Sequence, residues 1–152
     1  MGEVRAAKEA PVGAPADIVY ALIADHREHH PRFLPPAFSD FVVEEGGVGA
    51  GTVTRFTVTA GGRSRAFHMR VEEPEPGRVM TERDLDSTLV TTWTVTPAGD
   101  TSRVRIETVW QGAGGIGGFF ERLFAPRVME RLYTDELERL DRYAREQPPA
   151  QV

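Results

Sequence analysis

The stretch from Gly115 to Glu146, GIGGFFERLFAPRVMERLYTDELERLDRYARE, decides the fold of this chain. Its apolar residues recur at the three- and four-residue spacing of a helix, which predicts one long amphipathic helix with a break at Pro126. These apolar residues are Phe119, Phe120, Leu123, Phe124, Val128, Met129, Leu132, Tyr133, Leu137, Leu140 and Tyr143 or Ala144. The opposite face carries acids four residues ahead of arginines, the favourable order on a solvated helix surface.

The apolar stripe of this helix needs a large apolar partner. Burying one aliphatic or aromatic side chain stabilises a fold by roughly 1.5–3 kcal/mol, whereas ordering each residue costs about 1–2 kcal/mol of backbone entropy. The run of predicted strands before the helix is the only candidate partner. We expect Pro126 to kink or restart the helix and the first half, Gly117–Phe124, to act as a movable lid.

The composition favours one soluble domain over residues 3–146, followed by a disordered tail over residues 147–152. The 152 residues contain no apolar run long enough to cross a bilayer, and Met1–Ala10 is not a secretory leader, so we expect a cytoplasmic protein without membrane insertion. The net charge of −5 and the lack of a basic cluster argue against nucleic-acid binding. The absence of cysteine excludes disulfides and thiolate metal sites.

The first third of the chain predicts a strand followed by short helices. Val4–Ala10 can form the strand, and Pro15-Ala16-Asp17 has the proline and the acid that open a helix. The segment Asp25–Pro36 either ends that helix or continues into a second short helix before its prolines extend the chain. Phe38–Glu44 is the next predicted strand.

Two tight turns fix the register of two hairpins. Gly61-Gly62 joins the strands Thr52–Thr59 and Arg63–Glu72, and it places Phe56 opposite Phe67. The inner face of this hairpin then carries Thr52, Thr54, Phe56, Phe67, Met69 and Val71, whereas Arg55 and His68 lie on the solvent side.

The second hairpin joins Thr88–Thr96 to Ser102–Gln111 through Gly99-Asp100 and places Thr91 opposite Thr108. Its inner face carries Leu89, Thr91, Trp93, Val95, Val104, Ile106, Thr108 and Trp110. This face is apolar except for two hydroxyls beside two indoles.

The phase of the strand Arg78–Asp84 stays open, because a slip of one residue exchanges its two faces. Either Val79, Thr81 and Arg83 point inward, or Met80, Glu82 and Asp84 do. We favour the first arrangement, because it buries one charge and not two neighbouring acids.

The element order is one strand, two short helices, six strands and a long C-terminal helix, which predicts an α+β fold with a seven-stranded antiparallel sheet wrapped around that helix. This order resembles the helix-grip fold of the START-like (SRPBCC) superfamily, in particular its polyketide cyclase/dehydrase and lipid-transport group. The resemblance covers Glu3 to Arg145 and includes the segments APADIVY (Ala14–Tyr20), GAGT (Gly49–Thr52) and TWTV (Thr92–Val95).

The resemblance implies a cavity for a small hydrophobic or aromatic ligand, polyketide- or lipid-like, between the sheet and the C-terminal helix. The residues expected to bind this ligand are Phe56, Phe67, Met69, Arg83, Thr91, Trp93, Thr108, Trp110, Phe120, Phe124 and Tyr133. The alternatives are a cofactor-independent polyketide cyclase, aromatase or dehydratase that uses the same cavity, and a protein-interaction module like the chaperone activators of this superfamily. No serine lies in a nucleophile motif, so catalytic residues stay unassigned and the oligomeric state stays open.

Two further patterns are set aside. Gly112–Gly117 matches G-x-G-x-x-G, but the second strand of a dinucleotide-binding unit does not follow, so we interpret the segment as a flexible connection. His26, His29 and His30 would share one face of a helix, as metal ligands do, but Pro31 disfavours helical geometry at His30. We therefore expect a solvated helix end, with a role for His30 or Arg32 at the cavity mouth as the alternative, and neither a metal nor a cofactor.

Overall fold

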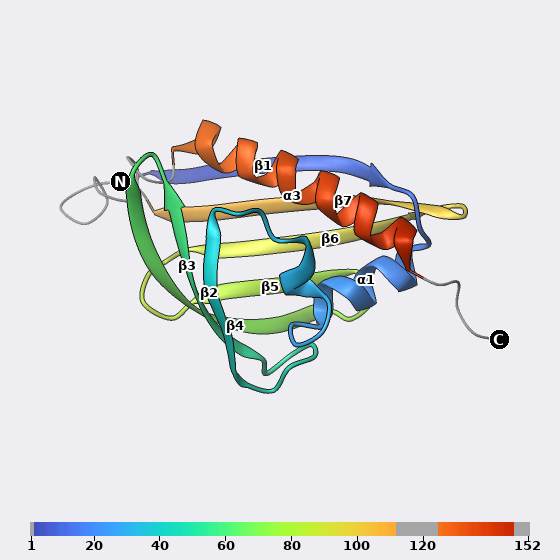
Figure 1. The fold of residues 1–152 in the computed structure, drawn as a ribbon, viewed down its shortest axis with the longest axis horizontal. Helices are drawn as coiled ribbons and strands as arrows, with labels where there is room; N and C mark the ends of the chain where they lie inside the picture. Colours follow the sequence, from blue (N-terminus) through green and yellow to red (C-terminus); the bar gives the residue numbers. More distant parts are fainter. Residues whose placement is uncertain (1, 112–124, 148–152) are drawn as a thin grey trace.

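The computed structural model describes residues 2–111 and 125–147. The chain forms one seven-stranded antiparallel sheet in the order β1-β7-β6-β5-β4-β3-β2, together with helices that pack on one of its faces (Figure 1). The elements are β1 (Glu3–Val12), α1 (Ala16–Ala24), the 3-10 helix η1 (His30–Phe33), β2 (Phe38–Glu45), β3 (Val53–Ala60), β4 (Arg63–Glu75), β5 (Val79–Asp84), β6 (Val90–Ala98), β7 (Thr101–Gln111) and α3 (Pro126–Glu146). The predicted helix-grip architecture is confirmed, with α1 and η1 as the two short helices after the first strand.

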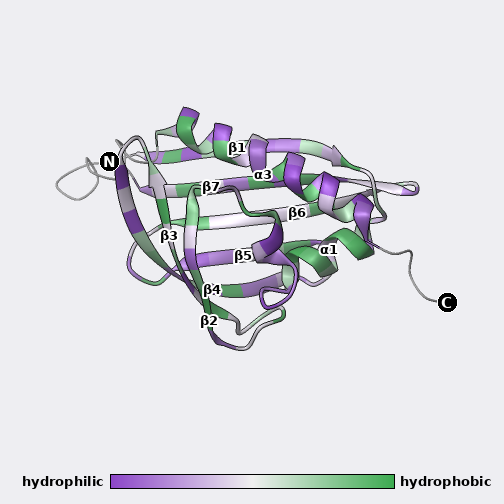
Figure 2. Cartoon of the chain, in the orientation of Figure 1, coloured by the Kyte–Doolittle hydropathy of each residue, from purple (hydrophilic) through white to green (hydrophobic). Residues whose placement is uncertain are grey.

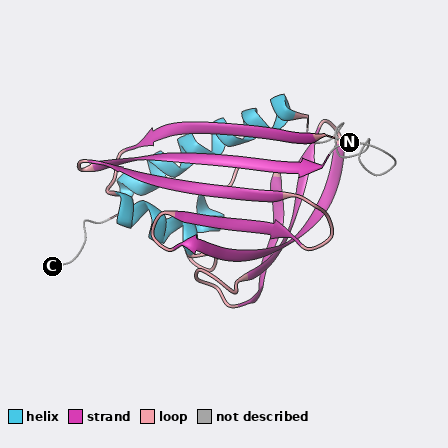
Figure 3. Ribbon diagram, turned by 180° about the vertical axis from the view of Figure 1, so that it is seen from behind, coloured by secondary structure: helices cyan, strands magenta, loops and turns pink. Residues whose placement is uncertain are grey.

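The helix α3 lies along the sheet and packs against β1, with α1 and η1 beside its C-terminal half (Figure 1). Seen from behind, the strands lie in front of all the described helices, so these helices cover one face only (Figure 3). Along several strands, hydrophobic and hydrophilic residues alternate, as expected for a sheet with one buried face (Figure 2). None of the helices within the described ranges is long and apolar enough to span a membrane.

Both predicted hairpin registers are confirmed. Phe56 pairs with Phe67 across β3 and β4, and Thr91 pairs with Thr108 across β6 and β7. Gly61 and Gly62 adopt φ values of 59° and 77°, which a two-residue hairpin turn of this kind requires at both positions and which glycine adopts without a steric penalty. The expected placement of Arg55 and His68 away from the core is also confirmed, since both contact Glu44 on the outer side of the sheet.

The favoured phase of β5 is wrong. Met80, Glu82 and Asp84 are buried, and the side chain of Arg83 is 55% exposed and lies near Glu72. Both buried acids have polar partners. Trp93 Nε1 on β6 donates to Glu82 Oε1 at 2.7 Å. Asp84 Oδ2 lies 2.9 Å from Arg65 Nη2 on β4 and accepts a hydrogen bond of 2.7 Å from Ser87 Oγ in the turn that follows β5. The preference for one buried charge over two fails here because Asp84 has a charged partner in Arg65 and Glu82 accepts a hydrogen bond from a buried indole.

The helix α3 begins at Pro126, with Ala125 as its N-terminal cap residue. Proline suits the first helical position because the backbone N–H that it lacks would have no partner within the helix. The proposed lid Gly117–Phe124 and the glycine-rich segment Gly112–Gly117 lie outside the described residues. Residues 148–152, most of the predicted tail, also lie outside them.

Candidate functional site

A cavity of about 50 Å³ lies between the inner face of the sheet and α3. Its apolar wall consists of Leu34, Phe38, Phe41, Phe56, Val58, Phe67, Met69, Leu89, Trp93, Ile106, Met129 and Leu132. Five polar side chains complete the lining: His30, Glu82, Thr91, Tyr133 and Glu136. An apolar wall with a few convergent polar groups is the usual composition of a small-molecule site.

Six of the predicted ligand-binding residues line this cavity: Phe56, Phe67, Met69, Thr91, Trp93 and Tyr133. Thr108 and Trp110 are buried on the same side of the sheet but do not line the cavity. Arg83 lies on the opposite side, so its predicted inward orientation is wrong. Phe120 and Phe124 lie outside the described residues.

Aromatic rings from β2, β3 and β4 form one wall of the cavity. The ring of Phe56 lies 5.4 Å from that of Phe67, 5.5 Å from that of Phe38 and 6.0 Å from that of Phe41, measured between centroids. Such offset or tilted ring pairs add to the free energy of burial. On β3 and β4, Phe56 and Phe67 belong to the alternating rows of the inner face. Phe38 and Phe41 are three residues apart on β2, and an irregularity in the register between Ser39 and Val42 lets both rings reach this face.

A chain of three hydroxyls connects β6, β7 and α3. Thr91 Oγ1 lies 2.7 Å from Thr108 Oγ1, which in turn contacts the hydroxyl of Tyr133. Burial raises the pKa of Tyr133 above its ordinary value, so its hydroxyl keeps its proton at neutral pH. This chain gives the apolar cavity a neutral hydrogen-bonding group on the side of α3.

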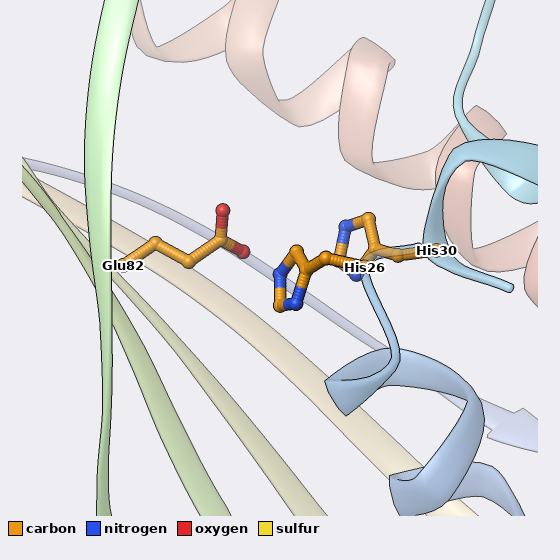
Figure 4. Close-up of side chains that lie close together, drawn as sticks. All are labelled: His26, His30 and Glu82. Carbon is orange, nitrogen blue, oxygen red and sulfur yellow. The ribbon is translucent and has the colours of Figure 1, made fainter. Parts of the chain in front are cut away.

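His26 and His30 lie stacked at the C-terminal end of α1, with ring centroids 4.6 Å apart and planes 12° from parallel (Figure 4). His26 Nδ1 lies 3.0 Å from the carbonyl oxygen of Ala24, and His30 Nδ1 lies 2.7 Å from that of Ile23. A carbonyl only accepts hydrogen bonds, so in each neutral ring Nδ1 carries the proton and Nε2 holds a lone pair. Burial lowers the pKa of both histidines to about 4 and keeps them neutral.

Two buried carboxyl groups face the histidines. Glu82 of β5 points toward the imidazole pair (Figure 4), and Glu136 of α3 places Oε2 4.0 Å from His30 Nε2. Burial raises the pKa of Glu82 and, far more strongly, that of Glu136. Because burial also keeps His30 neutral, the contact between Glu136 and His30 is one of uncharged polar groups and not an ion pair.

The expected solvated helix end is wrong for His26 and His30, which are 1% and 3% exposed. The last carbonyls of a helix have no partner within the helix, and here the two imidazoles provide donors to those of Ile23 and Ala24. The chain stays turned through His30 because the backbone N–H groups of His29 and His30 both donate to the carbonyl of Asp25. Pro31 is accommodated at the start of η1, where it does not interrupt this turn.

Sequence patterns could have indicated both missed acids. Glu136 follows Tyr133 by three residues and precedes Leu140 by four, so it falls within the apolar stripe of the helix. Glu82 alternates with Met80, a long apolar residue suited to the inner face. An acid at a core position is unusual, and it indicates either a specific partner or a functional site.

The chain belongs to the family described as "Polyketide cyclase / dehydrase and lipid transport", whose model matches residues 2–145. Among solved structures, the KanY protein is 37% identical, with a TM-score of 0.84 and coverage of 95% of this chain and 99% of that chain. The Zhui aromatase/cyclase from Streptomyces sp. R1128 is 21% identical, with a TM-score of 0.74 and coverage of 95% and 94%. A comparison with curated protein sequences gave no match.

A third similar structure is norcoclaurine synthase from Thalictrum flavum in complex with dopamine and hydroxybenzaldehyde. It is 18% identical, with a TM-score of 0.73 and coverage of 98% of this chain and 90% of that chain. At this identity the likeness, like that to the Zhui aromatase/cyclase, establishes a shared fold.

Proposed function

We propose that this protein binds a small, mainly apolar molecule, aromatic and polyketide-like or lipid-like, in the cavity between the sheet and α3. The observation that carries the proposal is the convergence of Thr91, Glu82, His30, Tyr133 and Glu136 on a cavity whose remaining lining is aromatic or aliphatic. The polar groups would orient the ligand, and burial of its apolar surface would supply most of the affinity.

The size of the cavity sets a condition on binding. Roughly 10–15 Å³ of such space holds one water molecule, so the present volume of about 50 Å³ accommodates only a few waters. A drug-sized ligand needs a site of about 300–1,000 Å³. Binding must therefore displace lining side chains, and Met129 on α3 is suited to this because an unbranched thioether side chain repacks easily.

Ligand binding can be tested by thermal unfolding with a panel of aromatic polyketides, fatty acids and sterols. A bound ligand stabilises the folded state and raises Tm with concentration. Thr91→Phe should abolish this rise because the ring fills the cavity, whereas Thr96→Phe, exposed on the same strand, should leave it intact. The proposal fails if no compound raises Tm, or if Thr91→Phe and wild type respond equally.

A second candidate function is cofactor-independent cyclisation of a polyketide-like substrate, the enzyme alternative that the family resemblance implies. The observation that favours it is a pair of proton donors, Tyr133 and Glu136, one turn apart on α3 and both lining the cavity. Burial raises the pKa of both groups, so that both favour the protonated form and could donate hydrogen bonds to a carbonyl oxygen on which negative charge develops. The Zhui aromatase/cyclase shares this fold.

The enzyme alternative predicts that Glu136→Gln binds substrate nearly as well as wild type but turns it over far more slowly, by a factor on the order of 100. Binding can be followed by the change in Tm and turnover by chromatography of the product. If a compound binds but is recovered unchanged from wild-type protein after long incubation, the binding function alone applies to that compound.

A further inference from the structure

His26, His30 and Glu82 come together from the turn after α1, from η1 and from β5. Their candidate ligand atoms all lie within 4.8 Å of one another, and the three residues are 1%, 3% and 7% exposed (Figure 4). Within the described part of the chain, the buried His26 Nε2 has no hydrogen-bond partner. A buried polar atom without a partner costs about 1–3 kcal/mol, so this lone pair requires an explanation.

The surroundings of the two rings are those of metal-binding histidines. In each ring the Nδ1 proton is held by a backbone carbonyl, which fixes the tautomer and leaves Nε2 as the donor atom. Glu82 Oε1 accepts the indole N–H of Trp93 at 2.7 Å, which holds the carboxyl in place and leaves its second oxygen available. The ligands and the groups that orient them are therefore both present.

We propose that His26, His30 and Glu82 bind one divalent first-row metal ion, of which Zn²⁺ is the simplest probe. Two imidazoles and one carboxylate form a donor set that such ions accept, with open coordination positions remaining. Ligand atoms around tetrahedral zinc lie roughly 3.4 Å apart, given bonds of about 2.0–2.1 Å, so binding draws the three side chains closer together. The ion also provides the buried carboxylate with a charged partner, which the described residues around Glu82 do not.

The open positions of this site would face the ligand cavity. His30 and Glu82 are both part of the cavity lining, and Glu136, with Oε2 4.0 Å from His30 Nε2, lies on the same side. An ion held here could be reached through the cavity, and it could contact a polar group of whatever molecule occupies that space. The proposal does not depend on the identity of the apolar ligand, because the metal is tested alone.

The first test measures Zn²⁺ binding to the full chain after treatment with a chelator, by competition with a chromogenic chelator. We expect one ion per chain. Loss of a residue that only supports a metal ligand weakens metal affinity roughly 10–100-fold. The Zn²⁺ affinity should fall by at least this factor in each of three variants: His26→Gln, His30→Gln and Glu82→Gln. Glu82→Gln keeps an acceptor for the indole of Trp93, so this variant preserves the packing.

The other two histidines provide matched controls. His29→Gln changes a neighbouring residue whose Nδ1 contacts the hydroxyl of Tyr143, and His68→Gln removes the histidine paired with Glu44 on the outer side of the sheet. Both variants should bind Zn²⁺ as wild type does. Binding that disappears with His68→Gln, or that persists unchanged in Glu82→Gln, would overturn the proposal.

A second test needs no variant. The chain has four histidines, so imidazole ¹⁵N signals can be assigned in the wild-type protein. Zn²⁺ should shift the Nε2 signals of His26 and His30 and leave those of His29 and His68 in place. Shifts at His68 alone, or no saturable shift at any histidine, would exclude the site.

Discussion

The carboxyl oxygen Oε2 of Glu136, on α3, lies 4.0 Å from Nε2 of His30, on η1, and both residues line the cavity. Burial shifts the pKa of Glu136 well upward and that of His30 down to about 4, so each group favours its uncharged form. This pair therefore presents polar atoms without fixed charge to the cavity. This combination suits a mostly apolar ligand that carries one or two oxygen atoms.

Glu136→Leu should increase the free energy of unfolding by about 1 kcal/mol, because it replaces a carboxyl that burial disfavours by an apolar group of similar size. It should also weaken the binding of oxygen-containing ligands. Urea denaturation and ligand-induced changes in Tm measure the two effects. The exposed Glu138→Leu is the control and should change neither. A loss of stability greater than about 2 kcal/mol in Glu136→Leu would show that the carboxyl has strong partners in the folded state.

The orientation of β5 can be tested with two truncations on the same strand. Met80→Ala should cost about 2–5 kcal/mol of unfolding free energy, because Met80 is fully buried. Arg83→Ala should change stability by less than about 1 kcal/mol, since the contact of Arg83 with Glu72 is an exposed ion pair. Equal effects at the two positions in denaturant unfolding would contradict the observed phase of the strand.

The sequence predicts the two hairpins well because the information is local. The Gly61-Gly62 turn allows one register, and that register places Phe56 against Phe67 on an inner face that is otherwise apolar. The stripe of α3 is likewise readable from the spacing of its apolar residues. Ten residues of the cavity lining belong to these registers and this stripe: Phe56, Phe67, Met69, Leu89, Thr91, Trp93, Ile106, Met129, Leu132 and Tyr133.

The polar part of the site could not be derived in the same way. The inward orientation of Glu82 depends on the indole of Trp93, which belongs to a different strand, and the burial of His30 depends on the carbonyl of Ile23 at the end of α1. Rules that count charges or apply helix propensity do not include such tertiary partners. An acid within an apolar pattern, as at Glu136, is the sequence signal that deserves more weight.

Tyr133→Phe should lower the free energy of unfolding by about 1 kcal/mol, because it removes the hydroxyl that contacts Thr108 while Thr108 keeps its bond to Thr91. Its effect on ligand binding should be larger for ligands with a carbonyl group than for plain hydrocarbons, since only the former can use the hydroxyl. Calorimetric titration of a matched ligand pair measures this difference. Equal losses for both members of the pair would indicate a packing effect and remove Tyr133 from the polar contacts.

The emission of Trp93 tests the central claim most directly. Trp93 lines the cavity and Trp110, the second of two tryptophans, does not. In Trp110→Phe, where Trp93 is the only tryptophan, an apolar aromatic or lipid-like ligand should change the emission in a saturable way. In Trp93→Phe the remaining Trp110 should not respond. A saturable response in Trp93→Phe with none in Trp110→Phe, or no response in either variant across a chemically broad panel, would contradict ligand binding between the sheet and α3.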